Sequence, residues 1–150
     1  MELLSLNFKN IKKILIPTDG SDYSMRAAQY GISIAKIVSA QVVVVYVVDE
    51  VVLDQIAKIT VHEAAQRELK EDGKGYVNYV LGLAEKEGVS SSSLIEEGRP
   101  FERIVHLARD LNIDLIVMGT YGRRGAERIL IGSVAERVIE YATCPVLVIK

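Results

Sequence analysis

The sequence predicts an α/β fold in which a five-stranded parallel sheet is covered by helices on both faces, a doubly wound, Rossmann-like arrangement. Short apolar runs alternate with segments of helical periodicity, in the order βαβαβαβαβ. Strands that alternate with helices pair in parallel, because each helix returns the chain to the same end of the sheet. The run 41–48 contains six valines and no charged residue. Such a run is typical of a strand that is buried on both faces.

The first half of the chain supplies two strands and two helical regions. A strand over 12–18 ends near Pro17, and a helix capped by Ser21 or Asp22 runs to about residue 38. Its apolar positions are Ala27, Ala28, Ile32, Ala35 and Ile37. After the valine-rich strand, the polar region 49–75 allows two interpretations, a loop with a short helix or one long helix. We expect Gly73 and Gly75 to break or loosen any helix that precedes the helical segment 76–87.

The second half continues the alternation. A weak strand over 92–97 leads through a turn at 98–100 into a helix over 101–111, with Pro100 in its first turn. A strand over 114–119, a helix over 133–141 and a last strand over 145–149 complete the fold. Ser133 and Glu136 have the spacing of a capping box at the start of the last helix.

Composition indicates a single domain spanning 1–150, with 49% apolar residues, 25% charged residues and a net charge of −2. This balance gives no sign of a general nucleic-acid or membrane binder. A single cysteine excludes an intrachain disulfide and favours a reducing compartment. The sequence has neither a secretory signal nor an apolar run of bilayer length. We therefore expect a cytoplasmic protein.

A ligand site is expected beyond the carboxyl ends of the strands, where open parallel sheets bind their ligands. The end of the first strand contributes Pro17, Thr18 and Asp19, and Asp19 has the chemistry to accept from ribose hydroxyls or to hold a metal ion. Val47 and Met118, at the ends of two other strands, form a candidate apolar slot for a base. Asp19 also has a simpler interpretation as a turn residue.

The glycine-rich stretch after residue 118 is the most informative motif. Gly119 and Gly122 follow an apolar strand, and Gly132-Ser133 follows nine residues later at the start of a helix. Glycines allow close approach of the backbone, and a helix N-terminus favours an anion such as phosphate. Gly122, Gly132, Ser133 and Val134 are therefore candidate N–H donors. Taken alone, Gly132-Ser133 is better explained as a simple helix cap, and only its combination with the preceding strand and glycines favours a ligand site.

Three arginines in the same stretch allow two interpretations of equal weight, either screening of phosphates or a solvated surface run; they are Arg123, Arg124 and Arg128. A Walker-type phosphate loop is absent, and the glycines do not match the dinucleotide-binding pattern in spacing or position. His62 and His106 have no metal-ligand spacing. No general base with a partner is evident, so at most weak hydrolysis of a bound nucleotide is expected.

These motifs together resemble the ATP-binding branch of the universal stress protein family. The resemblance rests on the spacing Gly-two-Gly-nine-Gly-Ser and on the segments 14–21, 48–49, 98–100, 114–119 and 144–149. It implies a fold of the adenine nucleotide alpha-hydrolase-like type and a homodimer joined through the last strand. It also implies a nucleotide site lined by Asp19, Val47, Gly119, Gly122, Gly132, Ser133 and Val134.

The expected function is that of a stress-response regulator that binds ATP, with or without Mg²⁺, and signals through contacts with a protein partner that the sequence does not name. Two alternatives stay open. One is a slow ATPase or phosphotransferase, and the other is a dimerisation module without a ligand.

Overall fold

The five strands form one parallel sheet. The structure is a computed structural model that describes residues 8–121 and 131–150. The strand order is β3-β2-β1-β4-β5, and every neighbouring pair is parallel. The strands are β1 (Lys13–Pro17), β2 (Gln41–Asp49), β3 (Ser91–Gly98), β4 (Leu115–Gly119) and β5 (Val146–Ile149). This arrangement confirms the predicted fold class.

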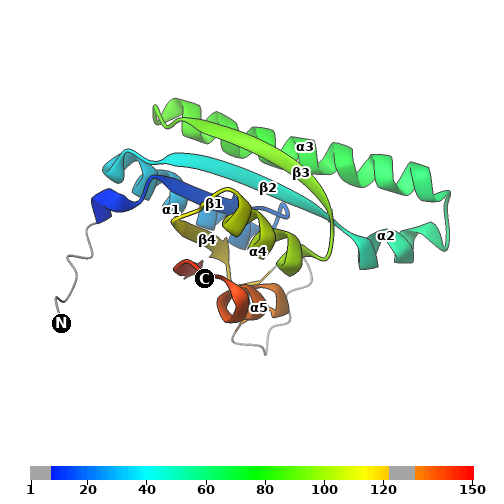
Figure 1. Cartoon of the computed structure of the whole chain (residues 1–150). Helices are drawn as coiled ribbons and strands as arrows, with labels where there is room; N and C mark the ends of the chain where they lie inside the picture. Colours follow the sequence, from blue (N-terminus) through cyan, green and yellow to red (C-terminus); the bar gives the residue numbers. More distant parts are fainter. Residues whose placement is uncertain (1–7, 122–130) are drawn as a thin grey trace.

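The sheet separates two groups of helices (Figure 1). After a short 3-10 helix at Phe8–Asn10, the helices are α1 (Asp22–Val38), α2 (Glu50–Ala57), α3 (His62–Lys86), α4 (Pro100–Asp110) and α5 (Ser133–Tyr141). α1, α2 and α3 pack on one face of the sheet, and α4 and α5 pack on the other. In the part of the chain that the structure describes, no helix is both long enough and apolar enough to cross a membrane.

The valine-rich strand β2 contributes to the core on both faces of the sheet. Val42, Val44 and Val48 pack with the α1 and α3 side, whereas Val43 and Val45 pack with the α4 and α5 side. Successive side chains of a strand point to opposite faces, so a strand covered on both sides needs apolar residues at every position. This requirement explains why the run lacks the apolar-polar alternation of a half-exposed strand.

Helix α1 matches its predicted bounds but not all of its predicted apolar face. The Ser21 hydroxyl accepts a hydrogen bond from Ser24 N at 3.2 Å, which caps the helix as expected. Ile37, however, is 82% exposed, and its assignment to the buried face was wrong. Ile37 lies two residues after the buried Ala35. Residues two apart on a helix lie on nearly opposite faces, so the Ile37 side chain points away from the sheet.

The expected break at Gly73 and Gly75 is also wrong, because α3 runs through both glycines for 25 residues. A short helix, α2, precedes it, so the region 49–75 combines features of both interpretations. Gly73 is buried, and a methyl group added there would overlap the ring of Tyr46. The glycine therefore allows close packing of α3 on β2, which offsets its weak helix propensity.

Candidate functional site

A cavity of about 320 Å³ lies at the carboxyl end of the sheet. Nine of the predicted site residues line it: Pro17, Thr18, Asp19, Val47, Met118, Gly119, Gly132, Ser133 and Val134. The other two, Gly122 and Arg123, lie outside the described residues, as do Arg124 and Arg128. Parallel strands bring their carboxyl ends to one edge, so residues from distant parts of the sequence meet here.

Further residues line the cavity that the sequence did not single out as ligand-binding. They are Ser24, Val45, Tyr46, Asp49, Val52, Leu69, Pro100, Ile104, Thr120, Tyr121 and Ala135. The residues from the end of β2 and from the first turns of α4 are expected here, because the carboxyl ends of parallel strands meet at one edge of the sheet. Val52 and Leu69 come from α2 and α3, whose conformation the sequence left open. Nothing in the local sequence pattern around these two residues indicates that they reach the site.

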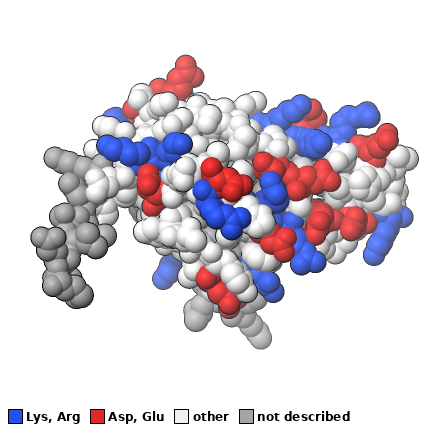
Figure 2. All heavy atoms as spheres, in the orientation of Figure 1, with Lys and Arg blue, Asp and Glu red and all other residues white. Residues whose placement is uncertain are grey.

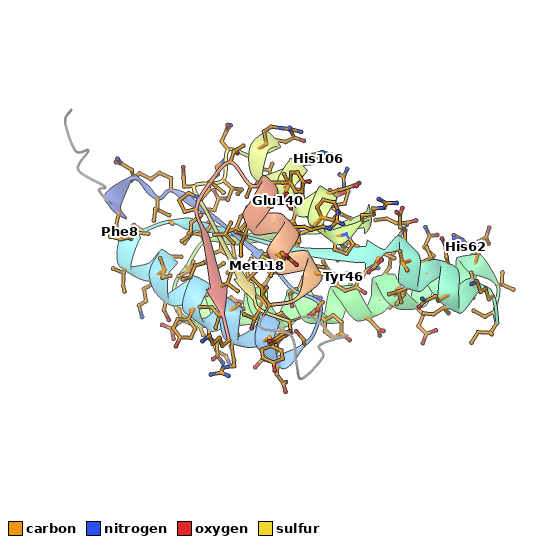
Figure 3. The ribbon with its side chains drawn as sticks, turned by 90° about the horizontal axis from the view of Figure 1, so that it is seen from below. Phe8, Tyr46, His62, His106, Met118 and Glu140 are labelled. Carbon is orange, nitrogen blue, oxygen red and sulfur yellow. The ribbon has the colours of Figure 1, made fainter. Side chains whose placement is uncertain are left out.

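The apolar wall of the cavity comes mainly from β2, β4 and α4. Val47 is half-buried, whereas Ile104 and Met118 are almost fully buried beside it. Figure 3 shows Met118 and Tyr46 in the part of the molecule where β4, β2 and α5 come together. Such a wall suits a flat apolar group such as an aromatic base, because most of a ligand's buried surface in a pocket contacts apolar side chains.

The loop between β1 and α1 places a carboxylate at the cavity. Asp19 Oδ1 accepts a hydrogen bond from Ser21 N at 2.9 Å, and Gly20 has a φ of +82°. The hydroxyls of Thr18 and Ser24 lie 3.2 Å apart and are hydrogen-bonded beneath the loop. Asp19 therefore has the role of a turn residue, which was the simpler of its two interpretations from the sequence. The same turn holds its side chain at the cavity lining, so the two roles are compatible.

Gly119 has a packing role that the sequence did not reveal. A Cβ at this position would lie 2.8 Å from both the carbonyl carbon and the Cβ of Tyr23, and 3.0 Å from Ser24 N. The first turn of α1 therefore sits directly on the end of β4. The sequence explains this glycine by the close approach of a ligand, and the structure adds the close approach of a helix as a second physical reason for it.

Gly132 also serves chain packing. Its N–H donates to the Thr120 carbonyl at 2.6 Å, and a Cβ would lie 2.7 Å from that same oxygen. Thr120 in turn donates through N and Oγ1 to the Ile149 carbonyl, at 2.8 and 3.1 Å. The end of β5, the residue after β4 and the start of α5 are thus joined by consecutive hydrogen bonds.

The start of α5 differs from the predicted capping box. Gly132 is the N-cap residue, with an extended backbone and no side-chain cap, and Ser133 is already the first helical residue. The prediction was wrong by one position, because the chain must still be extended at Gly132 to reach Thr120. The first N–H groups of a helix have no partner within the helix. Those of α5 lie at the cavity and have the chemistry to bind an anion.

The cavity rim carries charges of both signs. Arg99 pairs with Glu50 at 3.1 Å and with Glu102 at 3.7 Å, next to the lining residues Asp49 and Pro100. Figure 2 shows acidic and basic side chains interspersed on this side of the molecule. These pairs tie α2 to α4 at the surface, and each exposed pair is worth little in stability by itself.

A metal centre built from clustered side chains is not found within the described parts of the chain, where no three or more His, Cys, Asp or Glu side chains gather. Figure 3 shows His62 and His106 far from each other and from Met118.

Comparison with known proteins agrees with the fold and the motifs. The sequence profile of the Universal stress protein family matches residues 10–150. The chain is 48% identical over 139 residues to universal stress protein MJ0531 of Methanocaldococcus jannaschii. The aligned residues cover 93% of this chain and 82% of that protein. It is 29% identical over 145 residues to universal stress protein YxiE of Bacillus subtilis, at 92% and 98% coverage.

Two solved structures are also similar. One is the protein MJ0577 of Methanocaldococcus jannaschii, with a TM-score of 0.83 and 31% identity over 93% of this chain and 96% of that one. The other is a universal stress protein in complex with cAMP, with a TM-score of 0.62 and 25% identity over 93% and 96% of the two chains.

Proposed function

The chain belongs to the universal stress protein family, and we propose that it binds ATP in the cavity at the carboxyl end of its sheet. The observation that carries the proposal is the meeting of an apolar wall, a carboxylate and a helix N-terminus in one cavity. Its volume of about 320 Å³ is within the range of small-molecule sites. The cAMP complex of a similar protein supports a nucleotide as the class of ligand.

We propose a place in the cavity for each part of ATP. We propose that the base lies between Val47 and Met118, and that Asp19 accepts from the ribose hydroxyls or meets a bound Mg²⁺. Pro17, Thr18 and Gly119 complete the floor beneath the sugar. The backbone N–H groups of Ser133 and Val134, together with the Ser133 hydroxyl, are then proposed to bind the phosphates. The sequence motif adds Gly122 and Arg123 to the phosphate end.

Calorimetric titration with ATP tests this proposal on the wild type and on Val47→Trp. The indole would occupy the space assigned to the base, so we expect ATP affinity to fall at least about tenfold, or ~1.4 kcal/mol. The matched control is Ile37→Trp, which adds the same ring at an exposed position on α1. An equal affinity in the two variants would reject the cavity as the ATP site.

In the cell we propose a cytoplasmic regulator that reports nucleotide state through contacts with a protein partner. Among the described residues that line the cavity, the only groups capable of acid, base or nucleophilic chemistry are Asp19, Asp49 and the side-chain hydroxyls. This small set favours binding over fast turnover. Steady-state formation of ADP from ATP separates this function from that of a slow ATPase, which also releases phosphate, and from that of a phosphotransferase, which passes the phosphoryl group to an acceptor. ADP formation over many turnovers would favour an enzyme.

We further propose a homodimer through β5. This strand is at one edge of the sheet, and three of its apolar side chains, Val146, Leu147 and Val148, are only half-buried. On the neighbouring helix, Ile139 and Tyr141 are 48% and 53% exposed. An apolar edge strand is a liability unless it is covered, and a two-fold partner would cover it with the same strand.

Light scattering at micromolar concentration tests the dimer. We expect a dimer for the wild type and a larger monomer fraction for Val148→Lys, with Ile37→Lys as the control for an added surface charge. A wild-type monomer under these conditions would reject the interface.

A further inference from the structure

Helix α3 makes two close contacts between a glycine and a tyrosine ring beside the cavity. Gly73 lies against the ring of Tyr46, and the ring of Tyr76 lies against Gly20. A methyl group added at either glycine would overlap the ring that faces it. The two rings are themselves in contact, with centroids 5.9 Å apart and planes inclined by 57°. Residues three apart share one face of a helix, so Gly73 and Tyr76 contact the sheet side together.

The second contact bears on the loop that carries Asp19. Gly20 has a φ of +82°, a conformation in which few side chains are tolerated, and it stands between Asp19 and Ser21. The hydrogen bond from Ser21 N to Asp19 Oδ1 spans this glycine. The Tyr76 ring therefore covers a residue whose backbone rotation would move the Asp19 carboxylate relative to Ser21.

We propose that Tyr76 is a positioning residue for Asp19 in nucleotide binding, with its ring holding Gly20 so that the Asp19 carboxylate stays at the cavity. Tyr76 does not line the cavity itself, so it acts through the loop. The inference rests on the proposed nucleotide function for its ligand, but the restraint on the loop is a property of the free protein.

The role is separable from the folding of α3. The helix is anchored to the sheet by Val77, Val80 and Ala84, which are buried, whereas Tyr76 is only partly buried. Removing the ring from this position leaves those anchors in place. The chain also supplies a matched control in Tyr79, which lies three residues further along α3 and is 55% exposed.

The first arm of the test uses the protein without ligand. Amide hydrogen exchange at Gly20 and Ser21 reports how often the loop opens. We expect Tyr76→Ala to speed this exchange at least about tenfold, and Tyr76→Phe and Tyr79→Ala to leave it near the wild-type rate. Unchanged exchange in Tyr76→Ala would overturn the positioning role whether or not the protein binds ATP. Equally fast exchange in Tyr76→Phe would assign the effect to the hydroxyl and would overturn the role of the ring.

The second arm measures ATP affinity in a double-mutant cycle with Asp19→Ala. We expect Tyr76→Ala to weaken ATP about fivefold in the wild-type background and to have no effect when Asp19 is already absent. Equal effects in both backgrounds, or no effect of Asp19→Ala alone, would overturn the link from Tyr76 to the ligand. A wild type that binds no ATP would instead reject the proposed function, and the exchange arm would still decide whether Tyr76 restrains the loop.

Discussion

The two ends of the parallel sheet are built in opposite ways. At the amino end the connections are short and tightly bonded: Asp114 Oδ2 accepts from Lys12 N and Lys13 N at 2.8 and 2.9 Å, and Lys13 Nζ donates to the Leu111 carbonyl. Two helices end there in left-handed residues, Ser39 and Asn112. At the carboxyl end the connection from β4 to α5 is longer, spanning residues 120–132, and strand ends and helix starts line a cavity.

The difference shows how one architecture separates stability from binding. At the amino end the Asp114 carboxylate is used to satisfy backbone N–H groups of the neighbouring strand segment. At the carboxyl end the Asp19 carboxylate satisfies one N–H within its own loop and still lines the cavity. Helix N-termini also point to this end, so their dipoles favour a negative ligand here. We therefore expect substitutions at the amino end to change stability, and substitutions at the carboxyl end to change affinity.

The largest effect is expected for Asp114→Ala at the amino end. It removes the acceptor for two backbone N–H groups, so we expect the free energy of unfolding in urea to fall by about 3 kcal/mol. ATP affinity should change by less than about twofold, because the cavity is at the other end of the sheet. Asp114→Asn keeps one acceptor oxygen and should recover part of the loss. A large loss of ATP affinity in a folded Asp114→Ala protein would contradict the separation.

Gly119→Ala tests a place where we expect stability and ATP affinity to fall together. The added methyl group would meet the backbone of Tyr23 and Ser24 and push α1 away from β4. We expect a loss of about 2 kcal/mol in stability and weaker ATP binding, because α1 also positions the Thr18–Ser21 loop. Gly82→Ala is the control, since a Cβ there meets no atom within 4 Å. Wild-type stability in Gly119→Ala would show that the close packing of α1 is not required.

Ser133→Asp should move stability and affinity in opposite directions. A negative charge in the first turn of α5 interacts favourably with the helix dipole, so we expect a gain of about 0.5 kcal/mol in unfolding free energy. The same charge repels phosphate, so ATP affinity should fall at least about tenfold. Ser133→Asn is the uncharged control of similar size. Denaturation and calorimetry on the three proteins check this, and unchanged affinity in Ser133→Asp would remove α5 from the phosphate site.

The smallest effect is expected at the exposed pair of Lys36 and Glu87, which joins α1 and α3 at the amino end at 2.7 Å. The hydrogen bond from Lys36 and its charge lower the pKa of Glu87. A lowered folded-state pKa stabilises the protein above the unfolded-state pKa, and this contribution disappears as the pH falls through the folded value.

Lys36→Met should therefore raise the pKa of Glu87 toward its ordinary value, as measured by NMR titration. Any difference in stability between the variant and the wild type should be slight near neutral pH and absent in acid. A stability difference that grows as the pH falls would mean that Lys36 acts through another contact.

Much of the fold was predictable because each element has a local signal. The helix 133–141 has the bounds expected from its apolar pattern, and β2 follows from its valines. The continuous α3 was not predictable, because Gly73 looks unfavourable locally and is accommodated by Tyr46, which lies 27 positions earlier in the chain. The N-cap of α5 was missed for a related reason, since only the return of the chain to Thr120 shows that Gly132 is still extended.

The residues of the candidate site also divide into those that the sequence could place and those whose position depends on contacts between distant parts of the chain. Residues at the strand ends, such as Asp19 and Met118, could be placed together from the parallel order alone. Val52 and Leu69 could not, because their position depends on the turn between α2 and α3. The packing roles of Gly119 and Gly132 were also hidden, since a glycine in sequence shows freedom of the backbone but not what approaches it.

An NMR titration of the free protein with ATP, followed on backbone amides, tests the central claim most directly, because it reads both ends of the sheet in one experiment. We expect saturable shifts of the amides of Thr18, Asp19, Gly119, Ser133 and Val134, while those of Lys12, Lys13 and Asp114 stay in place. Saturable shifts confined to the amino end, or no shifts at either end, would contradict the central claim.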